Sequence, residues 1–213
     1  MVIKKNEVPV FLVNLVYILV FGSLSVGRKD YEFVIYALVI IVFAVLILLT
    51  QRKVEFPLSV LWGLTLWGFV HMAGGYIFLG GTRLYDVVFV HLVKVENDEI
   101  LRYDQIVHVI GFGVATLVCY HLLSRHLPKG VRPGVTLSAL VALMGMGLGA
   151  LNEVIELGVV LVAPQSGVGG YYNTGFDLVS NAVGATLAVV WINLQVASRK
   201  KREHTDEAHQ QGS

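Results

Sequence analysis

Long apolar runs alternate with short polar connections along almost the whole chain. Six of these runs have the roughly 17 to 25 residues that an α-helix needs to cross a lipid bilayer. They lie at about Pro9–Val26, Tyr31–Thr50, Leu58–Leu79, Tyr103–Ser124, Val135–Val162 and Phe176–Ala197. The pattern predicts an all-α membrane protein, a bundle of six transmembrane helices that forms a single domain over residues 1–198.

The first two runs differ from the last four in their small residues. The first two are rich in Val, Ile, Leu and Phe, and Asn14 is their main polar interruption. The last four carry many glycines, among them Gly145 and Gly149, whose spacing lets helix backbones approach closely. We therefore expect residues 58–197 to form the core of the bundle. Residues 199–213 are basic and then polar, which predicts a disordered cytoplasmic tail.

Composition supports a membrane location. Of the 213 residues, 55% are hydrophobic and only 15% are charged, whereas soluble domains carry about 25% charged residues. The formal net charge of +1 gives no indication of a nucleic-acid partner. Membrane lipids are the expected partners, and the sequence does not define an oligomeric state.

The basic residues predict the orientation in the membrane. They concentrate before the first helix, in the connections after the second and fourth helices, and directly after the sixth. The connection between the third and fourth helices is instead rich in acids. Because Lys and Arg favour cytoplasmic loops, both termini are expected in the cytoplasm of a multi-pass protein of the inner (cytoplasmic) membrane.

In this orientation, the ionisable residues of the last four helices fall at one depth, near the extracytoplasmic end. They are His71, Asp104, His108, Glu153, Glu156 and Asp177, accompanied by Asn152 and Asn181. A charged side chain in the bilayer centre costs about 2.5 to 3.5 kcal/mol on insertion scales. The pattern therefore predicts a polar pocket that opens outward, away from lipid.

Histidine and carboxylates that converge from several helices can bind a metal ion, and this donor set suits Zn, Mn or Fe. A divalent metal such as Zn would activate water, with a glutamate as base. The predicted metal ligands are His71, His108, Glu153 and Glu156. The predicted catalytic residues are Glu153, Glu156, His108, Asp104 and Asp177. The residues predicted to bind substrate are Tyr171, Tyr172, Asn152 and Asn181.

Other interpretations of these residues remain open. The same groups could act as acid and base without a metal, carry protons in a transporter, or only hold the helices together. Asp104 and Asp177 could each cap the start of a helix. His71 could simply bond a backbone carbonyl.

Two extracytoplasmic connections lie near the predicted pocket. Residues 82–102 contain apolar positions, which predicts a short helix or a hairpin on the membrane surface. Residues 165–175 are rich in glycine and contain Tyr171 and Tyr172. We expect this second segment to form a flexible cover with its tyrosines at the entrance, because tyrosine favours the membrane interface.

Five motifs carry a resemblance to known families. They are HMAGGY (71–76), LYD (84–86), RYDQIVHVIGFG (102–113), GALNEVIELG (149–158) and NTGFDLVSNAVGA (173–185). Together they resemble the YjdF-like family of predicted inner-membrane proteins. They are also similar, more loosely, to the VanZ-like family, whose patterns Asp104 and His108, Glu153 and Glu156, and Asp177 and Asn181 match.

The resemblance covers residues 60–190 and implies a membrane fold with an envelope-facing site. The expected function is a metal-assisted hydrolase or transferase that acts on a lipid or lipid-linked envelope substrate. The alternative is a proton-coupled transporter, or a membrane protein that binds a lipid or small molecule without catalysis. The residues alone do not establish an enzyme.

Overall fold

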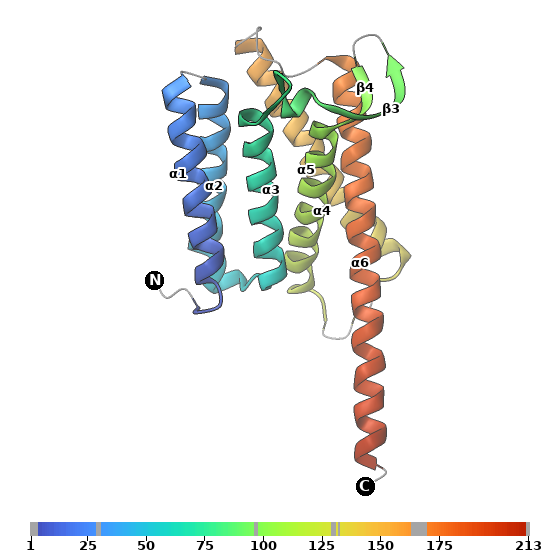
Figure 1. Ribbon diagram of the computed structural model, residues 1–213. Helices are drawn as coiled ribbons and strands as arrows, with labels where there is room; N and C mark the ends of the chain where they lie inside the picture. Colours follow the sequence, from blue (N-terminus) through green and yellow to red (C-terminus); the bar gives the residue numbers. More distant parts are fainter. Residues whose placement is uncertain are drawn as a thin grey trace.

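The computed structural model describes residues 4–28, 31–95, 98–128, 131, 133–162 and 170–211 (Figure 1). The elements are α1 (Val8–Arg28), α2 (Tyr31–Val54), α3 (Leu58–Tyr76), β1 (Phe78–Leu79), β2 (Thr82–Arg83), the 3-10 turn η1 (Leu84–Asp86), β3 (Val88–Val95), β4 (Asp98–Arg102), α4 (Tyr103–Ser124), α5 (Val135–Val162) and α6 (Tyr171–Gln211). Six α-helices thus lie within the described ranges, so the fold is mostly helical, with two small antiparallel hairpins in addition.

Four helices are long and apolar enough to cross a membrane, among the residues that could be assessed. They are Leu58–Tyr76, Tyr103–Ser124, Val135–Leu161 and Tyr171–Ser198, which lie in α3 to α6. In α1, the apolar stretch Val8–Leu24 is shorter. That α1 and α2 also cross the membrane, and that both termini are cytoplasmic, stay predictions.

Helix α6 is longer at both ends than the predicted segment Phe176–Ala197. It begins at Tyr171, where Thr174 N donates to Gly170 O at 3.0 Å. It continues to Gln211 and projects beyond the other helices (Figure 1). The tail predicted to be disordered, residues 199–213, is helical as far as Gln211. Arg, Lys, Glu and Gln, which favour helix, are frequent in it, and the next glycine is Gly212.

Helices α4 and α6 approach each other closely where both carry glycine. A β-carbon built on Gly184 would overlap Val109 O and lie 2.9 Å from Gly113 N. A larger residue at 184 would therefore push the two backbones apart. This contact brings the first turns of α6 next to the first turns of α4, where the candidate site residues lie.

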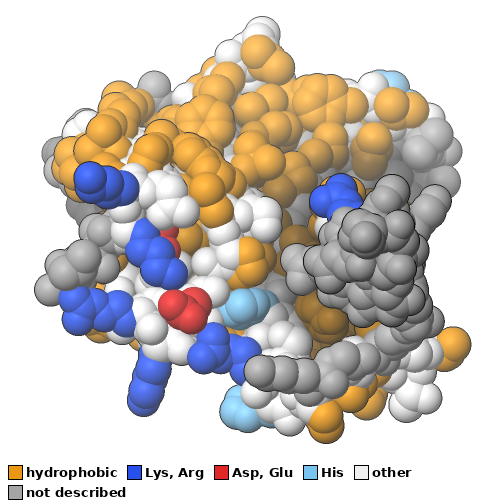
Figure 2. Space-filling model, turned by 90° about the horizontal axis from the view of Figure 1, so that it is seen from below, with side chains coloured by type: hydrophobic (Ala, Val, Ile, Leu, Met, Phe, Trp, Pro, Cys, Tyr) orange, Lys and Arg blue, Asp and Glu red, His pale blue; other side chains and the backbone are white. Residues whose placement is uncertain are grey.

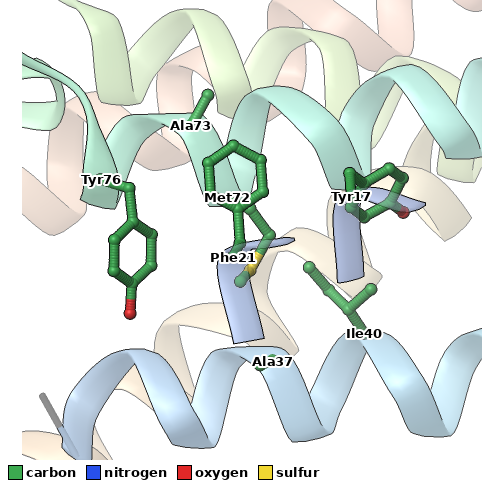
Figure 3. Close-up of a cluster of buried hydrophobic side chains, with 7 residues drawn as sticks. All are labelled: Tyr17, Phe21, Ala37, Ile40, Met72, Ala73 and Tyr76. Carbon is green, nitrogen blue, oxygen red and sulfur yellow. The ribbon is translucent and has the colours of Figure 1, made fainter. Parts of the chain in front are cut away.

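Helices α1 and α2 pack together at one side of the bundle, against α3 (Figure 1). Figure 3 shows the buried side chains that join the three helices: Tyr17, Phe21, Ala37, Ile40, Met72, Ala73 and Tyr76. The polar interruption at Asn14 strengthens the same interface, because its Nδ2 donates to Thr65 Oγ1 of α3 at 2.6 Å. Tyr17 also donates to Asn14 Oδ1 at 2.6 Å.

The connection between α3 and α4 consists mostly of hairpins. Strands β1 and β2 pair antiparallel, and so do β3 and β4. Of the two structures expected for residues 82–102, the hairpin is therefore correct. The second expected loop is shorter than predicted, because Tyr171 and Tyr172 form the first turn of α6; residues 165–169 lie outside the described residues.

Both termini lie at the end of the bundle opposite these hairpins (Figure 1). Figure 2 shows this face, where Lys and Arg side chains gather around a few acidic ones. The exposed basic residues here are Lys4, Lys5, Arg52, Lys53, Arg125 and Arg202. A high density of basic residues at one end is typical of a cytoplasmic face.

The same end contains a buried carboxylate, Glu7, which is 5% exposed. Gln51 Nε2 donates to Glu7 Oε1 at 2.9 Å, and Lys4 N donates to Glu7 Oε2 at 3.0 Å. Gln51 also exchanges two hydrogen bonds of 3.2 Å with the backbone of Phe56. We call Lys4, Glu7, Gln51 and Phe56 the Glu7 cluster; it ties the start of α1 to the connection between α2 and α3.

Candidate functional site

The site is built around His108, in the second turn of α4, which is 5% exposed. Its Nε2 lies 3.8 Å from Asp104 Oδ1 and 3.9 Å from Glu156 Oε1. Its Nδ1 lies 3.7 Å from Glu153 Oε1 and 3.0 Å from Asn181 Oδ1. Because an amide oxygen only accepts hydrogen bonds, Nδ1 carries a proton.

Helix α5 contributes two glutamates three positions apart, so both face α4. Asn152 Nδ2 donates to Glu156 Oε1 at 2.7 Å, which holds that carboxylate in place. Glu153 is 8% exposed, and neither of its carboxylate oxygens has a hydrogen-bond partner within 3.5 Å among the described residues, although the side-chain amides of Asn152 and Asn181 interact with it. An unsatisfied buried carboxylate is costly, so this arrangement favours a ligand at this position.

Helix α6 contributes Asp177, which is fully buried. Asn173, one turn earlier, donates from Nδ2 to Asp177 Oδ2. The other oxygen, Oδ1, lacks a hydrogen-bond partner in the part of the chain that the structure describes. Asp177 thus repeats the situation of Glu153 on a second helix. We call Asp104, His108, Glu153, Glu156 and Asp177 the His108 cluster.

A glycine on α5 makes room for the amide that orients His108. A β-carbon built on Gly149 would lie 2.5 Å from Asn181 Nδ2. Any larger residue at 149 would therefore displace Asn181 from its contact with His108. This explains locally why a glycine lies one turn before Glu153.

Two groups within the His108 cluster could each hold a metal ion. The ligand atoms of Asp104, His108 and Asp177 all lie within 4.8 Å of one another, and so do those of His108, Glu153 and Glu156. Metal–ligand distances are about 2.0 to 2.6 Å for divalent ions, so one ion could bridge each group after small side-chain movements. The unpartnered oxygens of Glu153 and Asp177 fit this use.

The structure brings together most of the predicted site residues. Asp104, His108, Glu153, Glu156 and Asp177 converge from α4, α5 and α6, with Asn152 and Asn181 directly beside them. These two amides bond Glu156 and His108, so their present contacts are with site residues.

The capping interpretation fails for one of the two aspartates. Asp177 lies in the second turn of α6, too far from Tyr171 to cap the helix. Asp104 does lie in the first turn of α4, where a negative charge is favourable. It therefore contributes to the helix start and to the His108 cluster at once.

His71 lies outside both donor groups. Its Nδ1 is 2.7 Å from the hydroxyl of Tyr85, which also lies 2.8 Å from His71 O. Its ring lies against Trp67, with centroids 5.6 Å apart. Tyr85 of the LYD motif thus holds His71, which the sequence had predicted as a metal ligand or, alternatively, as the partner of a backbone carbonyl.

Tyr171 and Tyr172 lie at the start of α6, and their rings are in contact with centroids 5.4 Å apart. Tyr171 is 87% exposed. Their predicted contact with a substrate stays a prediction. Sequence reasoning missed Asn173 as a site residue. It lies four positions before Asp177, a spacing that places both on one helix face, but the helix was expected to start only at Phe176.

Comparison with known protein families gives a match over most of the chain. A family model described as "Predicted membrane protein (DUF2238)" matches residues 9–198, a range that includes the whole His108 cluster. No curated protein and no solved structure matches the chain. This family is the YjdF-like family that the motifs resemble, whereas the looser similarity to the VanZ-like family finds no support. The chain belongs to the DUF2238 family of predicted membrane proteins.

Proposed function

We propose that this membrane protein is an enzyme that uses a divalent metal ion at the His108 cluster to hydrolyse or transfer a bond in a lipid or lipid-linked envelope substrate. The cluster would face the extracytoplasmic side of the cell membrane. The orientation is supported by the basic residues at the opposite end of the bundle.

One observation carries the proposal. Glu153 is buried within the bundle beside His108, and both of its carboxylate oxygens lack a hydrogen-bond partner among the described side chains and backbone. A carboxylate kept only for structure would gain from hydrogen bonds to both oxygens. A metal ion would supply the missing contacts and balance the charge.

The residues fit such an ion. Imidazole with carboxylates suits Zn, Mn or Fe, and His108, Glu153 and Glu156 form one compact donor group. Asn181 fixes the His108 proton on Nδ1 and leaves Nε2 to bind, as partners of metal-binding histidines commonly do. A divalent ion in this group would polarise a substrate oxygen and make a bound water acidic.

The remaining groups of the cluster handle protons and position. Glu156 is more accessible than Glu153, with 19% of its side chain exposed against 7%, so it would bind the ion through one carboxylate oxygen and accept a proton on the other. During hydrolysis, the water oxygen would form the new bond, Glu156 would take the water's proton, and the leaving oxygen would receive it. Asp104 and Asp177 would orient His108, while Tyr171 and Tyr172 would contact the substrate at the interface.

The test is a vesicle assay with the purified full chain. Proteoliposomes would be given a panel of lipid and lipid-linked phosphates and esters on the extracytoplasmic face, and product release would be followed by mass spectrometry. We expect metal-dependent turnover that EDTA abolishes and that is lost in Glu153→Gln and His108→Ala. Folded protein would be verified by gel filtration and by circular dichroism.

The competing function is a proton-coupled transporter or a binder. In that case, the same vesicles would show a proton flux that depends on Glu153 or Glu156 and no chemical change in any substrate. Loss of folded protein in both variants would instead indicate a cluster that only holds the helices together. Either result would replace the enzymatic proposal.

A further inference from the structure

The His108 cluster contains more donors than one metal ion needs. We propose that it holds two divalent cations, one bound by His108, Glu153 and Glu156 and a second bound by Asp104 and Asp177. This inference rests on the proposed function and adds a second ion to it. It changes the role of Asp104 and Asp177 from orienting His108 to binding metal.

The carboxylates form two donor groups that meet at the His108 imidazole. Each donor group spans no more than 4.8 Å, and the two groups share only His108. Nε2 lies at nearly equal distances from Asp104 Oδ1 on α4 and Glu156 Oε1 on α5, at 3.8 and 3.9 Å. Because Asn181 occupies Nδ1, only Nε2 can bind a metal ion. His108 can therefore be a ligand of one ion only, and carboxylates must hold the second ion or bridge the two.

Each group has its own deeply buried and unpartnered carboxylate. Glu153, in the first group, is 8% exposed and both of its oxygens lack hydrogen bonds. Asp177, in the second group, is fully buried and its Oδ1 lacks one, as far as the described residues go. A single ion in the first group would leave Asp177 Oδ1 unsatisfied, and a single ion in the second group would leave Glu153 unsatisfied.

The negative charge of the His108 cluster also favours two ions. Four carboxylates from α4, α5 and α6 surround one imidazole, and charges withdrawn from water must be balanced nearby. One divalent ion would balance two of these carboxylates, and a second would balance the other two. Arg102 and Asp86 both interact electrostatically with Asp104 from outside the cluster, and their opposite charges offset each other.

Carboxylate-rich centres with two metal ions are known in helix bundles. In catalytic pairs, ions about 3.5 to 4 Å apart hold both the attacking and the leaving oxygen. Protonation of the carboxylates could also remove the excess charge, without a second ion. Counting ions per chain separates these possibilities.

The experiment uses purified full-length protein in detergent, stripped of metal with EDTA and then titrated with Mn²⁺. Bound Mn²⁺ is counted after equilibrium dialysis, and electron paramagnetic resonance reports whether two ions are magnetically coupled. The variants are Asp177→Asn and Glu153→Gln. Glu55→Gln is the matched control, since it makes the same chemical change at an exposed position at the opposite end of the bundle.

We expect two Mn²⁺ per chain and a coupled spectrum in the wild type and in Glu55→Gln. Asp177→Asn and Glu153→Gln should each retain one ion, with the six-line spectrum of an isolated Mn²⁺. One uncoupled ion in the wild type would overturn the two-ion proposal, even if the variants fail to fold. If that protein still showed metal-dependent turnover, the proposed function would stand. No bound ion in the wild type would overturn both.

Discussion

The protein buries a glutamate at each end of its helix bundle, and the two glutamates differ in their hydrogen bonds. At the end with the chain termini, each carboxylate oxygen of Glu7 accepts a hydrogen bond, from Gln51 or from Lys4. At the other end, Glu153 is buried to a similar extent, at 8% exposed against 5%. Neither of its oxygens has a hydrogen-bond partner among the described residues.

This difference supports the proposal that Glu7 is a structural carboxylate and Glu153 a functional one. A buried polar group in a stable fold is normally satisfied, as Glu7 is. A group that stays unsatisfied is kept at a cost in stability, and such costs concentrate at functional sites. We therefore propose that the Glu7 cluster serves stability and the His108 cluster binds a ligand, and each of the following changes tests one part of this proposal.

The largest effect is expected from Glu153→Gln. Turnover in the vesicle assay should fall about 100-fold to 10,000-fold, the range typical for loss of one group that takes part in the chemistry. At the same time the metal-free variant should be more stable than metal-free wild type, by about 1 to 3 kcal/mol, because an unsatisfied buried charge is removed. Turnover and thermal unfolding in detergent measure the two effects; unchanged turnover, or a less stable variant, would argue that Glu153 is structural.

Replacing Asn181 should weaken metal binding without removing it. Asn181→Leu loses the contact that holds the His108 ring, and loss of such an orienting partner typically costs about 10-fold to 100-fold in metal affinity. Asn181→Asp keeps an acceptor and should retain most of the affinity. Competition with a chelating dye measures the dissociation constant.

A matched control for Asn181 lies on the same helix. Asn193 bonds Ser138 Oγ at 3.1 Å and has no contact with the His108 cluster among those described. Asn193→Leu should leave metal affinity unchanged. Equal losses in the two variants would mean that Asn181 acts only through packing.

The Glu7 cluster should respond in stability alone. Gln51→Leu removes the hydrogen bonds to Glu7 and to the Phe56 backbone and leaves these groups buried without partners. We expect a loss of about 1 to 3 kcal/mol and a lower melting temperature, with metal content and turnover per folded protein unchanged. Loss of metal in this variant would contradict the separation of the two ends.

The smallest effect is expected at Tyr171. Its side chain is 87% exposed, so Tyr171→Ala should change stability by no more than about 0.5 kcal/mol. If the ring contacts a substrate at the interface, KM should rise about twofold to threefold at constant kcat, which is the change that about 0.5 kcal/mol produces. A large fall in kcat would place Tyr171 in the chemistry itself.

The convergence of the site residues could be predicted because it follows from helix length, the helical repeat and the alternating direction of the helices. Bilayer thickness fixes the length of the helices, and the helical repeat places Asp104 with His108 and Glu153 with Glu156 on shared faces. Alternating helix direction then brings these faces to the same end of the bundle. No contact had to be known for this prediction.

The missed features depend on pairings that sequence periodicity does not encode. Gln51 is 44 positions from Glu7, and neither residue belongs to a recognisable pattern. Asn173 was missed because the glycine-rich residues before it suggested a loop, whereas Gly170 ends the connection and the helix starts directly afterwards. The extent of α6 beyond Ala197 follows from local helix propensity, which the hydrophobic pattern alone conceals.

Metal analysis tests the central claim most directly. Detergent-purified wild type would be measured by elemental analysis beside the Glu153→Gln/His108→Ala double variant and the Glu55→Gln control, each after reconstitution with Zn²⁺, Mn²⁺ or Fe²⁺. The account predicts at least one divalent ion per chain in the wild type and in Glu55→Gln, and at least one ion fewer in the double variant, which loses two ligands of the first donor group. A wild type that holds no metal, or a double variant that holds as much as the control, would contradict it.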